Sequence, residues 1–179
     1  MRYPQRSSTL VLGIGNILLR DEGVGVRVVE ALQRMELPGD VEVLDGGTAS
    51  MALLDTFTNR GKVIVIDAVR GNNAAGTLYR LTPTDIAALG GAQTSVHQLG
   101  LLDALIHMEC LGDAPREVII YGVEPKEMEW GMDLTPEVEA VIPRLVELVL
   151  AELATPTNRA VAANNDARRG SGSNVQLGT

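Results

Sequence analysis

The sequence is poor in cysteine and in basic residues, and it contains no long apolar run. The single Cys110 among 179 residues cannot form an internal disulfide, so we expect a reducing compartment. Acidic residues outnumber basic ones, 23 to 15, and the net charge of -8 argues against a surface that binds nucleic acid or an anionic membrane. No stretch is long enough to span a bilayer, and the amino-terminal apolar run lacks the pattern of a signal peptide because Asn16 and then acids interrupt it. These absences predict a soluble cytoplasmic protein whose partner is a protein or a small molecule.

Several familiar motifs are also missing. The stretch 11–25, VLGIGNILLRDEGVG, places Gly13 and Gly15 after an apolar run, but a dinucleotide fingerprint would need a third glycine where Leu18 stands. The Gly-Lys-Ser/Thr ending of a P-loop and the Gly-x-Ser-x-Gly elbow of a serine hydrolase are absent, and Cys110 lies far from the candidate histidine. A nucleotide-binding oxidoreductase stays open as an alternative, because Asp45 follows the second predicted strand.

The hydrophobic pattern predicts strands that alternate with helices. Strands are expected at about 9–14, 41–44, 62–66, 76–81 and 117–121, and helices at about 24–35, 48–58, 83–89, 96–111 and 135–153. Parallel strands need crossovers of the kind that these helices provide, so we predict a three-layer α/β/α sandwich with a mostly parallel sheet of about five strands. Residues 1–154 should form a single domain, and 155–179, which have few bulky apolar side chains, a disordered carboxyl-terminal tail.

Two details of the predicted helices can be checked directly. In the helix at 96–111, the spacing indicates an apolar face made of Leu99, Leu102, Leu105, Ile106 and Leu111. In the last helix, Thr135 is expected to cap the amino terminus, and the interior Pro143 to cause a kink or a break.

Three polar residues are predicted to meet at one edge of the sheet. Glu22 follows the turn after the first strand, Asp67 ends the central strand, and His97 lies in the first turn of a helix, where the neutral imidazole is favoured. Alone, Asp21 and Glu22 could be ordinary helix amino-terminal acids, Asp67 a loop cap, and His97 a cap or packing residue. Together, two carboxylates and one imidazole are suited to a borderline divalent ion with open coordination positions. His107, deeper in the same helix, is expected to be structural or at the surface.

Four segments of the chain resemble the hydrogenase maturation endopeptidases. They are GIGNILLRDEGVGVRVVEAL at 13–32, LDGGT at 44–48, IDA at 66–68 and HQLGL at 97–101. Members of this family remove a carboxyl-terminal extension from the large subunit of nickel-iron hydrogenases once nickel has been inserted. The resemblance covers about residues 8–153, with one visible departure at Val96, where some relatives carry proline.

The resemblance implies a site and a partner that spacing alone does not give. It implies that Glu22, Asp67 and His97 form the metal-binding and catalytic site of an endopeptidase, whether aspartyl-type or metal-dependent. It also implies that the segment Asp45, Gly46, Gly47 and Thr48 recognises the substrate. The nickel belongs to the hydrogenase precursor, so the free enzyme, expected to be a monomer, should carry little of it.

Two points remain open at this stage. Water could be activated as a metal-bound hydroxide or by a carboxylate general base, since both are physically adequate. A non-catalytic nickel-sensing module with the same three ligands is a further alternative to the endopeptidase.

Overall fold

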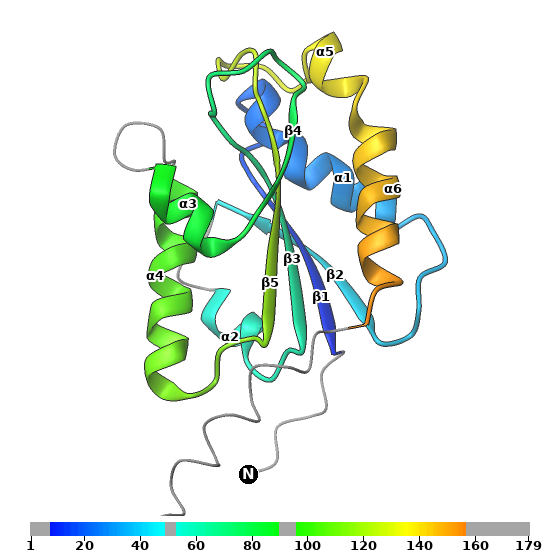
Figure 1. The fold of residues 1–179 in the computed structure, drawn as a ribbon. Helices are drawn as coiled ribbons and strands as arrows, with labels where there is room; N and C mark the ends of the chain where they lie inside the picture. Colours follow the sequence, from blue (N-terminus) through cyan, green and yellow to red (C-terminus); the bar gives the residue numbers. More distant parts are fainter. Residues whose placement is uncertain (1–7, 49–52, 90–95, 157–179) are drawn as a thin grey trace, which may run out of the picture.

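The computed structural model describes residues 8–48, 53–89 and 96–156, which fold around one central sheet. Its five strands lie in the order β2-β1-β3-β5-β4, and every neighbouring pair is parallel except β4 and β5. Figure 1 shows α1 and α6 on one side of the sheet and α2, α3 and α4 on the other. The predicted three-layer sandwich is therefore confirmed. None of the helices in the described ranges is long and apolar enough to cross a membrane.

The predicted elements are all present. The predicted bounds hold at 9–14, 83–89 and 96–111 and differ elsewhere, and residues 49–52 of the helix predicted at 48–58 lie outside the described part of the chain. The strands are β1 (Thr9–Ile14), β2 (Val41–Gly47), β3 (Lys62–Ala68), β4 (Leu78–Leu81) and β5 (Glu117–Val123). The helices are η1 (Arg20–Gly23, a 3-10 helix), α1 (Val24–Leu32), α2 (Leu53–Phe57), α3 (Pro83–Leu89), α4 (Val96–Leu111), α5 (Pro136–Glu139) and α6 (Ile142–Leu153).

The central strand β3 supplies both hydrophobic cores. Its β-branched residues favour the extended backbone, and all seven of its residues are buried because helices cover both faces of the sheet. Ile64 and Ile66 pack into the core beneath α1 and α6, whereas Val63 and Val65 pack into the core beneath α2, α3 and α4. Alternate side chains of one strand thus hold both helical layers.

Strand β2 is longer than predicted. The pairing with β1 continues past a register shift to Ile14 and Gly47, and the Gly15 amide donates to the Gly47 carbonyl at 2.9 Å. The sequence placed Asp45 to Gly47 in a loop, because glycine and aspartate are poor strand formers. Backbone pairing with a buried neighbour overrides that preference, so these residues belong to the strand.

The apolar face predicted for α4 is wrong at three of its five positions. Leu99 is 50% exposed, Ile106 58% and Leu111 71%, whereas Leu101 and Met108 are among the buried residues. This helix carries apolar side chains on all its sides, so residue spacing does not single out one stripe. The packing against the sheet decides which side is buried.

The carboxyl-terminal helix is broken near Pro143, as the sequence predicted. α5 ends at Glu139, and α6 begins at Ile142 with Pro143 in its first turn, where proline does not disturb the hydrogen bonding. Thr135 precedes α5 as expected, but its side chain makes no capping hydrogen bond. The Thr135 hydroxyl donates to the carboxylate of Asp21 instead.

Asp21 fastens η1 to the segment between β5 and α5. Its side chain is fully buried, and Oδ2 accepts hydrogen bonds from the backbone amides of Lys126 and Glu127, each at 2.9 Å. Oδ1 accepts the amide of Thr135 at 2.7 Å. Hydrogen bonds to an ionised group are stronger than neutral ones, and they compensate for the burial of the charge. Asp21 is therefore a structural clamp and more than a helix amino-terminal acid.

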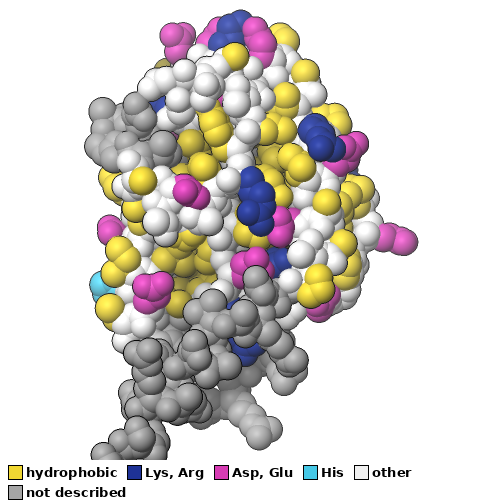
Figure 2. All heavy atoms as spheres, viewed as in Figure 1, with side chains coloured by type: hydrophobic (Ala, Val, Ile, Leu, Met, Phe, Trp, Pro, Cys, Tyr) yellow, Lys and Arg dark blue, Asp and Glu magenta, His cyan; other side chains and the backbone are white. Residues whose placement is uncertain are grey.

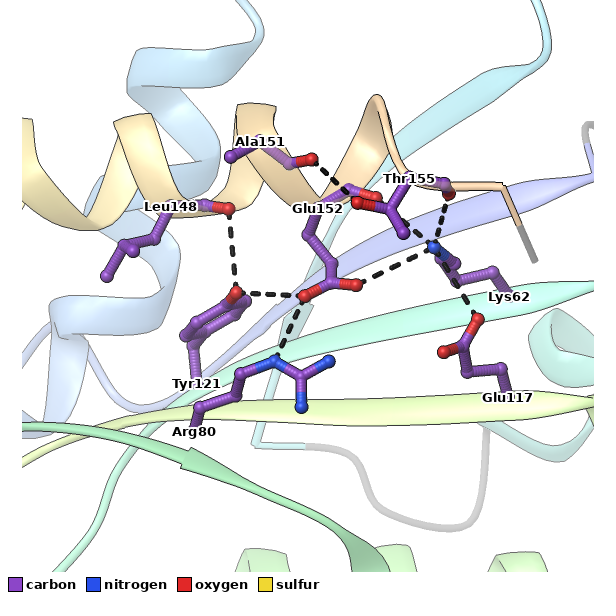
Figure 3. Close-up of polar contacts among 8 residues, drawn as sticks. All are labelled: Lys62, Arg80, Glu117, Tyr121, Leu148, Ala151, Glu152 and Thr155. Carbon is purple, nitrogen blue, oxygen red and sulfur yellow. Dashed lines mark hydrogen bonds and ion pairs between the residues drawn. The ribbon is translucent and has the colours of Figure 1, made fainter. Parts of the chain in front are cut away.

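The buried Lys62 fastens the end of α6 to the sheet (Figure 3). Its ammonium group donates to the carbonyls of Glu152 at 3.1 Å and Thr155 at 2.8 Å, and it pairs with the carboxylates of Glu117 and Glu152 at 3.5 and 3.7 Å. Thr155 thus contacts the core, one residue beyond the predicted domain end at 154. Of the predicted tail, residues 157–179 lie outside the described part of the chain.

The Glu152 carboxylate joins the same network from α6. It accepts hydrogen bonds from the Tyr121 hydroxyl at 3.1 Å and from Arg80 Nε at 3.0 Å. Burial alone would raise the pKa of Glu152, but these hydrogen bonds and the charges of Arg80 and Lys62 outweigh it and lower the pKa. A carboxyl with a lowered pKa in the folded state stabilises the fold above its ordinary pKa, and this stability is lost as the pH falls through the folded value.

We predict that Glu152→Gln lowers the free energy of unfolding by about 1–3 kcal/mol at neutral pH, because Lys62 loses a buried counter-charge. The matched control is Glu147→Gln on the same helix, where an exposed pair with Arg144 contributes little. Urea denaturation at neutral pH and well below the ordinary glutamate pKa of 4.5 measures both. The loss at Glu152 should shrink at acid pH, and a loss equal at both pH values would contradict the role of its charge.

We predict that Asp21→Asn destabilises the protein by about 2–4 kcal/mol, because it removes the buried charge and replaces one of the two acceptor oxygens with an NH2 group, which cannot accept a hydrogen bond from a backbone amide. Hydrogen exchange should show lost protection at the amides that face this NH2 group, either Lys126 and Glu127 or Thr135. The exposed Asp113→Asn serves as control and should leave these amides protected. Unchanged exchange in Asp21→Asn would mean that the clamp is not needed to hold this segment.

Candidate active site

Glu22 is carried to the carboxyl edge of the sheet by an unusually close helix-strand contact. A Cβ atom at Gly25 would lie 2.3 Å from the Ile66 carbonyl oxygen and 2.4 Å from that of Ile14. A Cβ atom at Gly15 would lie 1.8 Å from the Glu22 carbonyl oxygen, and Gly15 also has a φ of +144°. Only glycine fits at these two positions, which explains the glycines around the acidic pair. The turn of η1 that carries Glu22 therefore rests directly on the ends of β1 and β3.

Asp67 lies at the same edge. It is the penultimate residue of β3, is 2% exposed, and follows Ile66, whose carbonyl faces Gly25. Asp67 Oδ1 accepts the backbone amide of Ala68 at 2.8 Å, so the simpler interpretation of a local cap is correct for one of its oxygens. A buried carboxylate at the carboxyl end of a central parallel strand is also at the position where open α/β sheets bind their ligands.

The third predicted ligand, His97, lies in the first turn of α4 as expected, but its side chain lies outside the described part of the chain. The described side chains include no group of three or more His, Cys, Asp or Glu residues that could hold a metal ion. The assignment of Glu22, Asp67 and His97 as one metal site therefore remains a prediction. His107 is exposed, as expected for a surface residue.

A groove of about 310 Å³ runs beside this edge. The residues that line it are Gly15, Asn16, Ile17, Leu18, Val26, Asp45, Gly47 and Thr48. Asp45 is exposed, and its Oδ1 accepts the Gly47 amide at 2.8 Å. Asn16 closes the opposite turn, because its side-chain oxygen accepts the amide of Leu18 at 3.0 Å. A lining that combines two glycines with apolar and polar side chains is suited to a peptide.

The segment predicted to recognise the substrate thus lies beside the sheet edge that carries Glu22 and Asp67. Three of its four residues, Asp45, Gly47 and Thr48, line the groove. Gly46 does not, since a Cβ atom there would point at the side chain of Leu12 at 3.0 Å, and its backbone packs on the core.

The arrangement combines two carboxylates at one sheet edge with an adjoining groove. Carboxylate oxygens can bind a divalent ion or accept a proton from water, and the groove can hold the chain to be cut. On the face of the molecule that Figure 2 shows, basic side chains are scattered among acidic and hydrophobic ones and form no basic patch.

The clamp residue Asp21 was missed as a functional position by sequence reasoning. Its partners lie 105 to 114 residues further along the chain, so no local pattern indicates them. The one available signal was the adjacent pair of acids, which the helix dipole already explains.

The chain matches known proteins over most of its length. Residues 26–152 match the model of the hydrogenase maturation protease family, HycI. The hydrogenase 2 maturation protease of Escherichia coli strain K12 is 49% identical over 146 residues, which cover 80% of this chain and 89% of that protein.

Solved structures lead to the same group. The hydrogenase maturating endopeptidase HybD from E. coli has a TM-score of 0.76 at 48% identity, covering 83% of this chain and 92% of that one. The [NiFe] hydrogenase maturation protease HybD from Thermococcus kodakarensis has a TM-score of 0.67 at 27% identity, covering 84% and 100%. The resemblance found in the four sequence segments is thereby confirmed. From the family match, the identity and the shared fold together, it follows that the chain belongs to the hydrogenase maturation proteases and is an endopeptidase.

Proposed function

We propose that this endopeptidase removes the carboxyl-terminal extension of a nickel-iron hydrogenase large-subunit precursor after nickel insertion. The observation that carries the proposal is the meeting of η1, with Glu22, and the end of β3, with Asp67, at one sheet edge beside a groove. Family membership supports a hydrogenase precursor as the substrate. The enzyme acts in the cytoplasm as a monomer.

In this proposal the nickel ion arrives as part of the substrate. Two carboxylates and the imidazole of His97 offer few ligands and no thiolate, so they are suited to completing the coordination of an ion that the precursor already holds. An empty precursor gives Glu22, Asp67 and His97 nothing to bind. The binding energy that positions the scissile bond is then missing, and cleavage follows maturation.

The groove supplies the second half of the recognition. An extended segment of the precursor lies along Asp45, Gly47 and Thr48, where the Asp45 side chain is exposed and Gly47 adopts a φ of +50°. The hydrolytic water is activated either on the nickel or by a carboxylate base, and both routes use the same edge.

The alternatives have lost their support. The nucleotide-binding oxidoreductase rested on Gly13, Gly15 and Asp45, and the structure uses Gly13 and Gly15 for close contacts with α1 and η1. The non-catalytic nickel-sensing module was based on the ligand trio alone, and membership of a protease family favours catalysis.

We predict that Asp67→Asn and His97→Ala each reduce processing by at least about a hundredfold while circular dichroism stays unchanged, because both remove a group from the proposed site. Glu22→Gln should weaken processing less, since its amide oxygen can still coordinate a metal. The matched control is His107→Ala, an exposed histidine on the same helix α4. Normal processing by Asp67→Asn or His97→Ala would refute the assignment of the trio.

We predict that cleavage depends on nickel in the precursor and not on metal stored in the enzyme. Metal-stripped enzyme is incubated with nickel-loaded and nickel-free precursor, and the mass of the large subunit is followed with time. Only the loaded precursor should be shortened. Equal cleavage of both forms would refute the dependence, and cleavage only after zinc is added to the enzyme would indicate an ordinary metallopeptidase.

A further inference from the structure

Two loops expose large apolar side chains next to the groove. Trp130 is 80% exposed, Met132 56% and Leu18 45%. Leu18 lies in the turn between β1 and η1, and the other two lie between β5 and α5. We call these three residues the Trp130 platform. Exposed apolar side chains that gather at one place on a protein usually mark an interaction surface.

The backbone holds the platform together. A parallel bridge pairs Leu19 with Gly131, the Gly131 amide donates to the Leu18 carbonyl at 3.0 Å, and the Arg20 amide donates to the Gly131 carbonyl at 2.8 Å. In this register Leu18 lies beside Trp130. The Trp130 indole is therefore exposed on a backbone that is held in place by pairing, and its exposure does not come from a frayed loop.

Side chains add further ties. Arg20 pairs with Glu127 at 3.0 Å, Arg27 donates to the Met132 carbonyl at 3.1 Å, and the Asp21 clamp holds the start of the same segment. A surface that is already ordered loses little conformational entropy when it binds a partner. Tryptophan is also the residue type most enriched among those that dominate binding energy.

The platform is continuous with the groove, because Leu18 belongs to both. Glu129 and Asp133 flank Trp130 and Met132 in sequence; both are exposed, and neither has a hydrogen bond or ion pair within the described part of the chain. Arg20 and Arg27 also border the platform, but they pair with Glu127 and Glu30, so the charges of the rim that remain without a partner are acidic. A second copy of this chain would bring a like-charged rim against it, whereas a basic segment would be attracted.

We propose that the Trp130 platform binds a segment of the hydrogenase precursor in which an apolar side chain is flanked by lysine or arginine, next to the stretch held in the groove. This rests on the proposed function, since it names a second contact for the same substrate. The platform positions the precursor, and the chemistry stays with the edge that carries Glu22 and Asp67.

The first test is kinetic and uses the full chain with nickel-loaded precursor. Trp130→Ala should raise KM about tenfold or more with kcat nearly unchanged, which is typical of a lost binding contact. The control is Leu111→Ala, which removes a 71% exposed leucine from α4 and should leave KM unchanged. Failure of the wild-type enzyme to process the precursor would refute the proposed function, whereas wild-type processing with an unchanged KM in Trp130→Ala would refute the platform alone.

The second test observes the platform directly. Trp130 is the only tryptophan in the chain, so 5-fluorotryptophan labelling gives a single fluorine resonance, which should shift when unlabelled precursor is added to labelled Asp67→Asn enzyme. An unshifted resonance at saturating precursor would overturn the proposal. So would sedimentation of the enzyme alone as a dimer that Trp130→Ala converts to a monomer.

The third test addresses the acidic rim. Glu129→Lys combined with Asp133→Lys should raise KM, and the wild-type KM should increase with salt because screening weakens the attraction. A KM that is indifferent to both changes would overturn the basic character assigned to the bound segment.

Discussion

The buried carboxylate of Asp21 is the interaction on which the working edge of this enzyme depends. Its oxygens join the turn after the first strand to backbone amides more than a hundred residues later, at Lys126, Glu127 and Thr135. A buried charge is costly unless donors surround it, so the loops are stable only in the arrangement that supplies those donors. The adjacent Glu22 and the Trp130 platform take their places from this arrangement.

Glycine determines how closely the remaining parts of the edge approach. Gly25 lets the first turn of α1 contact the carbonyls at the ends of β1 and β3, and Gly15 lets the turn pass under Glu22. A single added Cβ atom would meet backbone at both positions, where nothing can move aside. The same short distances that leave no room for a side chain bring the two carboxylate-bearing elements together.

The proposed activity separates recognition from chemistry along this edge. In this proposal the groove and platform bind polypeptide, while Glu22, Asp67 and His97 bind an ion in the substrate. Neither part would then need the enzyme to hold a metal of its own. An immature precursor would lack the ion and therefore the binding energy contributed by Glu22, Asp67 and His97, so cleavage would depend on maturation.

The opposite end of the sheet, where β3 begins, has a structural role. There the buried Lys62 and Glu152 tie α6 to the strands, and Lys62 also holds the carbonyl of Thr155. The Lys62 ammonium group pairs with the Glu152 carboxylate, which also accepts hydrogen bonds from the Tyr121 hydroxyl and from Arg80 (Figure 3). This network stabilises the scaffold and leaves the opposite edge for function.

The sequence by itself determined the alternation of strands and helices, the mostly parallel sheet, the break near Pro143, the placement of Asp67 at a strand end and that of Glu22 after the turn that follows the first strand. These follow from hydrophobic periodicity and from local backbone preferences, which act over a few residues. Only the tertiary structure decided that Asp21 is a clamp, that β2 extends through Gly47, and which side of α4 is buried. Each of these depends on a partner distant in the chain, and the free energy of such a contact is not encoded in any local pattern.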